Sequence, residues 1–329
     1  MTANSSSGQM PASAAITIWV IVVTLAAIYG MWLGFGGPRF ALALGVAAAL
    51  FAFEFFIAVP GVQVKLQRRF VVHLGFLAPL VPLGLFLLYS TYSASLSHSP
   101  WLTVAGAAYV IAPALILSSS SGEAPGTWED YVAVAVVWLP IEFRWMYRVF
   151  PYPAPLTHTL TILLALGAGV AAFILLRRLG EIGYLLDWRR GYFTNFALLF
   201  VIFAAIAIPV GMKMHFLVWA PSIGRLRALP LSIIGILFFT AWPEEFLFRG
   251  LLQNLLSKTL KNSWLGLFVA AAIFGLSHIL HAPYPNWKYV ALASIAGVFY
   301  GLAWMRTRSL VPGVLMHALV DISWHLLFR

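Results

Sequence analysis

The sequence predicts an all-α protein, a polytopic bundle of helices that crosses a membrane many times. Of its 329 residues, 62% are hydrophobic and only 9% are charged, and the mean hydropathy is +0.92. The hydrophobic residues fall in long runs that short polar stretches separate. Apolar runs of about 18 or more residues with few charges are typical of transmembrane helices. This composition excludes a soluble domain.

Eleven apolar segments follow one another along the chain, and each is a candidate span. They cover residues 14–35, 40–59, 71–93, 101–118, 130–143, 156–176, 193–212, 231–256, 263–281, 288–305 and 309–327. A span needs about 20 residues, and the segment 130–143 is short for one, so we expect ten or eleven. The distribution of basic residues between the loops is nearly balanced and leans weakly toward a cytoplasmic N-terminus.

The basic residues that give the net charge of +10 are scattered in short pairs between the apolar runs. Arg68-Arg69, Arg177-Arg178 and Arg189-Arg190 are such pairs. Loops near anionic lipid have this pattern, so the expected partner is the lipid bilayer and not nucleic acid. The absence of cysteine excludes disulfides, thiolate nucleophiles and cysteine-based metal sites.

Three regions are expected along the chain. Residues 1–13 are polar, small and uncharged, lack the basic region of a signal peptide, and are predicted to form a disordered tail. Residues 14–176 form an N-terminal transmembrane region. The most charged loop, 177–192, marks the main boundary, and 190–327 form a compact block of five apolar segments. No linker is polar or long enough to separate the two halves, so we expect one bundle.

The most informative stretch reads A-W-P-E-E-F-L-F-R-G and lies within the apolar segment 231–256. A charge at bilayer depth costs about 2.5 kcal/mol or more, so such residues are functional candidates. Glu245 and Arg249 are four residues apart and can pair, which leaves Glu244 on another face. Pro243 is expected to kink the helix or start a new helical segment, where a carboxylate can meet water. A buried structural ion pair would explain this stretch equally well.

Two later segments also carry polar side chains within the apolar layer. Phe274 and His278 are four residues apart, as are His317 and Asp321, so each pair can share a helix face. Each residue alone can be a satisfied polar group of the bundle. Together with Glu244, they can also converge in one water-filled pocket between helices.

Glutamate, histidine and aspartate together serve either a general acid–base hydrolase or a metal site. No cofactor is expected, but neutral histidine and carboxylates suit zinc, so a divalent metal stays an alternative. The sequence lacks the motifs of the other classes of intramembrane protease. There is no H-E-x-x-H helix, no G-D pair, and the G-L-S-H sequence around Ser277 is not a nucleophile elbow.

An earlier stretch, W-L-P-I-E-F-R-W at Trp138–Trp145, has a similar order of residue types. Glu142 and Arg144 are two residues apart and do not share a helix face. The simpler interpretation is an interfacial helix end with an aromatic belt, and the alternative is a gate or a substrate contact. Glu54, within another apolar run, is expected to pair with an arginine or to face a polar cavity.

Three motifs stand in order on successive late segments. They are E-E-x-x-x-R at Glu244, Glu245 and Arg249, F-x-x-x-H at Phe274 and His278, and H-x-x-x-D at His317 and Asp321. In this order and spacing they resemble the CPBP family, the CAAX-prenyl-protease-like and bacteriocin-processing (Abi) intramembrane glutamic endopeptidases. The resemblance covers roughly residues 190–327 and not the first half of the chain.

The resemblance implies a role for each residue of the first two motifs. Glu244 would polarise a water that attacks the scissile carbonyl, and His278 would help as a base. Glu245 and Arg249 would hold the first motif in shape. A poorly solvated pocket favours the protonated form of a glutamate, whereas a neighbouring arginine favours the ionised form.

The third motif departs from the family pattern. The resemblance implies that His317 and residue 321 face the oxyanion, and the prenyl proteases typically have asparagine, a donor, at the second position. Here it is Asp321. An ionised carboxylate cannot donate to an oxyanion, so Asp321 would have to be protonated or would orient His317 as a carboxylate–imidazole pair.

The function predicted in this way is that of an integral-membrane endopeptidase that hydrolyses a peptide bond at or near the membrane surface. Its expected substrate is a peptide or a lipidated protein, and its expected location is the cell membrane of a prokaryote. One alternative is a non-catalytic immunity or partner-binding protein of the same fold. Another is a transporter, against which the lack of a clear inverted repeat argues.

Overall fold

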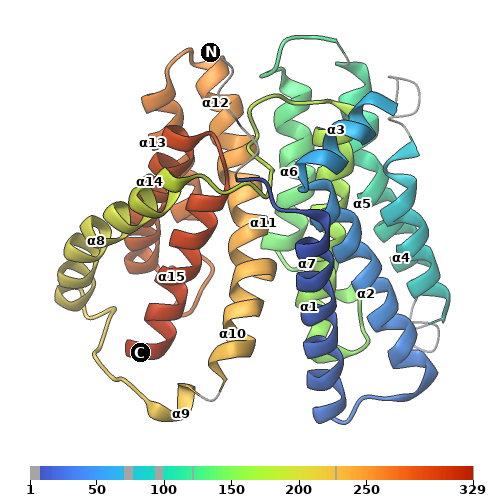
Figure 1. Ribbon diagram of the computed structural model, residues 1–329, viewed down its shortest axis with the longest axis horizontal. Helices are drawn as coiled ribbons and strands as arrows, with labels where there is room; N and C mark the ends of the chain where they lie inside the picture. Colours follow the sequence, from blue (N-terminus) through green and yellow to red (C-terminus); the bar gives the residue numbers. More distant parts are fainter. Residues whose placement is uncertain (1–7, 70–76, 93–98, 121, 227, 329) are drawn as a thin grey trace. The chain divides into compact units, whose positions relative to one another are not determined.

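The computed structural model describes residues 8–69, 77–92, 99–120, 122–226 and 228–328. The described chain is built from helices and contains no strand, only an isolated bridge between Trp219 and Phe328. It forms two compact units (Figure 1). The first comprises Glu181–Arg329 and the N-terminal residues up to Gly8, and the second comprises Gln9–Gly180. The predicted all-α fold class is confirmed.

Seven helices of the described chain are long and apolar enough to cross a membrane. They are Ala12–Trp32, Gly37–Ile57, Pro100–Ser119, Ala154–Leu176, Gly191–Lys213, Leu229–Thr259 and Trp287–Thr307. Three shorter apolar helices accompany them: Leu80–Tyr92, Ser263–Leu276 and Val311–Leu327. The multi-pass architecture is thereby confirmed, whereas the exact number of crossings stays a prediction.

The second unit contains seven α-helices and three shorter helical segments within its described residues. They are α1 (Ala12–Trp32), α2 (Gly37–Ile57), α3 (Pro60–Arg69), α4 (Leu80–Tyr92), α5 (Pro100–Ser119), α6 (Trp128–Glu142), η2 (Trp145–Val149), η3 (Ala154–Leu156), α7 (Thr157–Gly169) and η4 (Val170–Leu176). Its core is apolar, and two acidic side chains are buried in it. Glu54 on α2 lies against Gly167 of α7, and Asp130 on α6 pairs with Arg177 at 2.9 Å.

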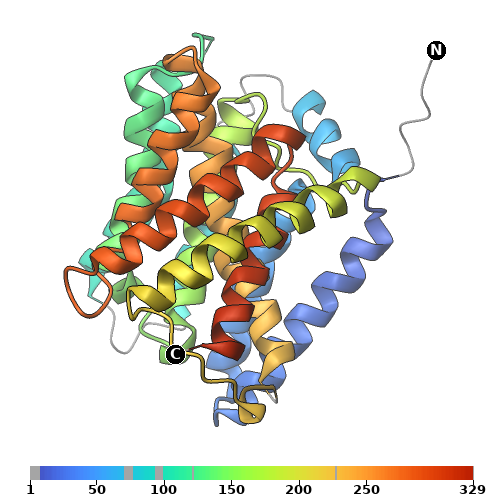
Figure 2. The ribbon, with the colours of Figure 1, turned by 90° about the vertical axis from the view of Figure 1, so that its left-hand side faces the viewer.

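The first unit holds the late motifs. Its elements are α8 (Arg190–Lys213), α9 (Ile223–Leu226), α10 (Leu229–Ile236), η5 (Leu237–Ala241), α11 (Trp242–Glu245), η6 (Phe246–Gln253), α12 (Asn254–Thr259), α13 (Ser263–Leu276), α14 (Trp287–Thr307) and α15 (Val311–Leu327). α13 packs against α14, and α8 packs against both α14 and α15. Figure 2 shows α8 running obliquely across this part of the unit.

The elements from α10 to α12 follow one another without a break and form a single helical rod, Leu229–Thr259 (Figure 1). Two of its segments, η5 before Pro243 and η6 after it, are π-helical. Proline lacks the N–H that an α-helix needs, and Pro243 lies inside this rod, in the short α-helical segment α11 between the two π-helical ones. π-Helical turns inside α-helices are frequent at functional sites, and here they flank the two glutamates.

The structure differs from the sequence analysis at two elements. Arg68 does not lie in a loop, because α3 extends to Arg69 as a separate polar helix. The segment 263–281 is α-helical only to Leu276, where turns begin. Residues 71–76 and 93 of the third predicted segment, and residues 1–7 of the predicted tail, lie outside the described residues.

The stretch Trp138–Trp145 does not fold like the stretch it resembles in sequence. α6 ends at Glu142, and Arg144 has a left-handed backbone with a φ of 58°. The indole nitrogen Nε1 of Trp138 donates to Glu142 Oε2 at 3.2 Å, one turn away on the same helix. The stretch around Glu244, by contrast, lies inside the continuous rod.

Candidate active site

The two glutamates and the arginine of the first motif lie near the middle of the long rod, and the arginine and one glutamate are buried. Glu245 and Arg249 are 0% and 2% exposed, and their pair joins Arg249 Nη1 to Glu245 Oε1 at 3.0 Å. Helical spacing brings the two together. About a third of the Glu244 side chain is accessible. The sequence therefore placed the pair and the separate glutamate as the structure has them.

His317 of α15 reaches the same pair from another helix. Its Nδ1 lies 2.9 Å from Glu245 Oε1, and the contact is buried. A carboxylate oxygen accepts, so Nδ1–H is the donor, and this bond fixes the orientation of the ring. The approach of α15 needs Gly313, because a Cβ at this position would meet Glu245 Oε2 at 2.9 Å. Glu245 therefore serves two partners, one on its own helix and one on α15.

The other nitrogen of His317 faces two further carboxylates. Nε2 lies 3.8 Å from Glu244 Oε2 and 3.7 Å from Asp321 Oδ2. Both distances are longer than a hydrogen bond and within the range of an ion pair. The Asp321 side chain is 23% accessible. The imidazole thus lies between one fully buried carboxylate and two that are partly accessible.

The cluster holds one more acidic group than basic groups. Three carboxyls, those of Glu244, Glu245 and Asp321, share the guanidinium of Arg249 and the imidazole of His317. Charges in a poorly solvated interior need partners, and titratable groups this close exchange protons as one system. The arrangement can therefore hold a proton or release it within the cluster.

Aromatic rings surround the buried part of the cluster. Tyr300 of α14 stacks on His317, with ring centroids 4.6 Å apart and an interplanar angle of 16°. The guanidinium carbon of Arg249 lies 4.3 Å from the centroid of Phe274 and 5.1 Å from that of Tyr300. Arg249 Nη2 also donates to the backbone oxygen of Gly297 at 3.3 Å. These contacts hold the guanidinium of Arg249 and the imidazole of His317 in place within an apolar surround.

His278 lies just beyond the end of α13, and its ring is oriented locally. Its Nδ1 is 2.9 Å from the backbone oxygen of Phe274 and 3.2 Å from the hydroxyl of Ser277. A carbonyl oxygen only accepts, so Nδ1 carries the proton, and Nε2 of the neutral ring has a lone pair. The Phe274 and His278 rings are 4.9 Å apart. The predicted i,i+4 contact exists although the helix ends between the two residues.

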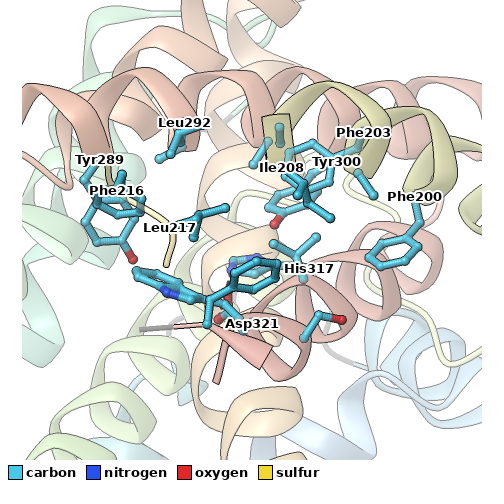
Figure 3. Close-up of a pocket in the computed structure, with 18 of the residues that line it drawn as sticks. Phe200, Phe203, Ile208, Phe216, Leu217, Tyr289, Leu292, Tyr300, His317 and Asp321 are labelled. Atoms are coloured by element: carbon cyan, nitrogen blue, oxygen red, sulfur yellow. Dashed lines mark ion pairs between the residues drawn. The ribbon is translucent and has the colours of Figure 1, made fainter. Parts of the chain in front are cut away.

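A cavity of about 110 Å³ joins the second and third motifs. His278, His317 and Asp321 are its polar groups of catalytic type. Apolar and aromatic side chains form the rest of the wall, among them Phe200, Phe203, Ala207, Ile208, Phe216, Leu217, Tyr289, Leu292, Tyr300 and Trp324. Figure 3 shows His317 and Asp321 next to each other in this lining. Glu244 does not line the cavity and reaches the site only through its contact with His317.

The structure therefore brings together five of the six predicted residues by direct contacts. Glu244, Glu245, Arg249, His317 and Asp321 form one cluster, and His278 shares the cavity with two of them. The sequence analysis did not single out Tyr300 or α8, because both lie in mostly apolar segments without a motif. In the described part of the chain, no three histidine, aspartate and glutamate side chains are arranged to hold a metal ion.

Comparison with known proteins gives one match. Residues 226–323 match the family model of the type II CAAX prenyl endopeptidase Rce1-like proteins. The matched region contains every residue of the three motifs. Neither the curated proteins nor the solved structures gave a match.

The matched region begins just before the long rod and ends within α15, so it coincides with the part of the first unit that builds the cluster. It covers 98 of the 329 residues. The resemblance inferred from the three motifs is confirmed. Over residues 226–323, this chain is therefore similar to the CAAX-protease-like family of membrane peptidases.

Proposed function

We propose that this protein is an intramembrane glutamic endopeptidase, in which Glu244 activates a water that attacks the scissile carbonyl. The substrate is a peptide or a lipidated protein presented at the membrane. The observation that carries the proposal is the cluster itself. Two helices bring three carboxyls, one guanidinium and one imidazole within 4 Å contacts, beside a mostly apolar cavity.

Among the three carboxyls, Glu244 is the best candidate for the base. Glu245 is fully buried and already bonds Arg249 and His317, so it holds the cluster together. Glu244 is the most accessible of the three, and its contact with His317 is longer than a hydrogen bond. A general base must reach water and must not be occupied by strong bonds.

His278 supports the proposal as the second base. The bond from its Nδ1 to the Phe274 oxygen leaves Nε2 as the nitrogen that can accept a proton. The ring lines the same cavity as His317 and Asp321. In this mechanism Glu244 takes a proton from the water as its oxygen bonds to the scissile carbon. A proton is then delivered to the leaving amine nitrogen as the C–N bond breaks, and His278 Nε2 assists this transfer.

His317 is suited to stabilise the oxyanion. Its Nδ1 is held by Glu245, so Nε2 is the atom directed toward the partly accessible carboxylates. Protonated at Nε2, the imidazole can donate to a developing negative charge. Asp321, 3.7 Å from Nε2, favours this protonated form electrostatically. This assignment gives Asp321 the role of a carboxylate partner for His317 instead of an oxyanion donor.

The direct test is cleavage by the purified protein in neutral detergent, with a fluorescent S-prenylated peptide that ends three residues after the prenylated cysteine. We expect Glu244→Gln to lower kcat/KM by about a hundredfold or more, because it removes a base and keeps the shape of the side chain. His278→Ala should give a loss of similar size.

The matched control is Glu181→Gln, the same chemical change at a glutamate that is 59% exposed and contacts Lys258 and Arg308 only at 3.9 Å. It should cleave like the unchanged protein. Full activity of folded Glu244→Gln would reject the glutamate as the base. Loss of cleavage on adding a strong chelator, with recovery on adding zinc, would replace the proposed mechanism by a metal-dependent one.

A further inference from the structure

The cavity beside the cluster contains a hydroxyl group to which the mechanism above gives no role. It belongs to Tyr300 of α14, a lining residue whose side chain is otherwise buried. Figure 3 shows the hydroxyl oxygen of Tyr300 directed into the cavity, toward His317. Within the described residues this hydroxyl makes no hydrogen bond. A phenol in a buried place normally has a hydrogen-bond partner, and a molecule bound in the cavity can supply one.

Two glycines, one on each side of Tyr300 in the sequence, fix the position of α14. A Cβ at Gly297 would press on α13, and one at Gly301 would lie 2.5 Å from Gln253 Oε1 of the rod. The rod also donates to the backbone oxygens of both glycines. Arg249 Nη2 bonds Gly297 and Gln253 Nε2 bonds Gly301, each at 3.3 Å. Because α14 is held against the rod at both points, the tyrosine ring between them has a fixed place beside the cluster.

The Tyr300 ring stacks on the imidazole of His317. The ring centroids are 4.6 Å apart and the planes differ by only 16°, and both side chains line the same cavity. The imidazole can donate from Nε2, as argued above, and the phenol can donate from its O–H. Two donors from stacked rings on one wall can converge on a single oxygen atom in the cavity.

The mechanism so far gives the oxyanion only one donor, Nε2 of His317. Ionised Asp321 can only accept a hydrogen bond, and the N–H of His278 already donates to the backbone oxygen of Phe274. Enzymes of acyl transfer stabilise the oxyanion with several fixed donors, placed where the negative charge develops. Among the polar groups that line the cavity, the hydroxyl of Tyr300 combines a fixed position with a place next to His317.

We propose that Tyr300 is a further catalytic residue, whose hydroxyl donates a hydrogen bond to the oxyanion beside the bond from His317 Nε2. The inference rests on the proposed peptidase function and deepens it. As the oxygen of the water bonds to the scissile carbon and its proton passes to Glu244, the π electrons of the carbonyl move to the carbonyl oxygen. That oxygen then accepts from both donors, and neither donor loses its proton. When the C–N bond breaks, the electron pair returns and the carbonyl forms again.

The first test is Tyr300→Phe, which removes one oxygen atom and keeps the ring that stacks on His317. With the fluorescent S-prenylated peptide, we expect kcat to fall about a hundredfold, the usual effect of losing one oxyanion donor. KM should change less than about twofold, because the bond forms only in the transition state. The matched control is Tyr284→Phe, at a tyrosine that is 71% exposed, and it should cleave like the unchanged protein.

The second test measures binding and needs no turnover. Two analogues of the same peptide replace the scissile amide. One is a phosphinic group, which is tetrahedral and carries an anionic oxygen, and the other is a trans alkene, which has no oxygen. Binding is followed by fluorescence anisotropy in neutral detergent. Tyr300→Phe should weaken binding of the phosphinic analogue about tenfold or more and leave that of the alkene analogue within about twofold. Tyr284→Phe should change neither.

Unchanged binding of the phosphinic analogue to Tyr300→Phe would overturn the inference, whether or not the protein cleaves a peptide. Equal weakening of both analogues, or a loss confined to KM, would also overturn it, because the hydroxyl would then hold the fold or the bound substrate.

The inference and the proposed function fail in distinguishable ways. Cleavage that is lost in Glu244→Gln and fully kept in Tyr300→Phe would reject the role of Tyr300 alone. Selective weakening of the phosphinic analogue in a protein that cleaves no peptide would support the oxyanion site and contradict the peptidase.

Discussion

The described part of the chain contains two buried pairs of an acid and an arginine, and they differ in what surrounds them. In the second unit, Asp130 accepts from Arg177 Nε at 2.9 Å and Nη2 at 3.2 Å, and from the backbone nitrogens of Gly126 and Thr127. Arg177 also donates to the backbone oxygens of Glu123 and Ala124. This pair is balanced, one acid against one base, and its hydrogen-bonding capacity is largely used.

The pair of the first unit is unbalanced. Glu245 and Arg249 are accompanied by Glu244, His317 and Asp321, and two of the contacts are longer than hydrogen bonds. A cavity adjoins this cluster. Saturated, balanced contacts stabilise a fold, whereas surplus carboxyls next to a cavity leave protons free to move. A buried ion pair therefore does not by itself indicate a catalytic site. Carboxyl groups without a full set of partners, next to a cavity, do.

The largest effect on stability is expected from breaking the balanced pair. Asp130→Ala leaves the guanidinium of Arg177 buried without its carboxylate and removes the acceptor of two backbone N–H groups. We expect a loss of about 3–5 kcal/mol in the free energy of unfolding, measured by denaturant titration in detergent. The folded fraction should keep its kcat/KM.

The control is Glu123→Ala, at an exposed neighbour that contacts Arg177 through its backbone oxygen. An unchanged unfolding free energy would contradict the structural role of the pair.

An intermediate effect on both properties is expected for Glu245→Gln. This change leaves Arg249 and His317 without their common anion and so touches the fold and the site together. Destabilisation should be about 1–3 kcal/mol, and kcat/KM should fall at least about tenfold. Both are measured on one preparation, with Glu181→Gln as the matched change. If stability falls and kcat/KM does not, the cluster would be structural like the other pair.

The smallest effect is expected for Asp321→Asn. The contact between Asp321 and His317 is 3.7 Å long, so the carboxylate acts on the imidazole only electrostatically. We expect kcat/KM for the prenylated peptide to fall less than about tenfold, with little change in unfolding. A loss as large as that of Glu244→Gln would instead make Asp321 a second essential carboxylate. Equal or higher activity would show that the asparagine of the related prenyl proteases serves this position as well.

Sequence reasoning was most successful where the contact is local. The pairs Glu245–Arg249 and Phe274–His278 lie four residues apart, and the contacts exist because the period of the helix brings such residues together. It was less successful at ends of elements. The end of α13 at Leu276 was missed, because an apolar run continues past it, and α3 was missed because its sequence is polar.

Contacts between segments far apart in the chain could not be predicted from the sequence alone. Nothing in the sequence selects Glu245 over Glu244 as the hydrogen-bond partner of His317, which is 72 residues away. The choice follows from the rotation of α15 about its axis and from the absence of a side chain at Gly313. The lining supplied by α8 and the stacking of Tyr300 on His317 arise in the same way.

By itself, the sequence determined a helical membrane protein, the three motifs and the local pairs within them, because hydropathy and helical period act over a few turns of one segment. Only the tertiary structure decided which carboxyl is buried and which is accessible, and it alone formed the cavity that His278, His317 and Asp321 line. Those properties depend on how helices far apart in the chain pack against one another, and packing is specified by the shapes of all the contacting side chains together.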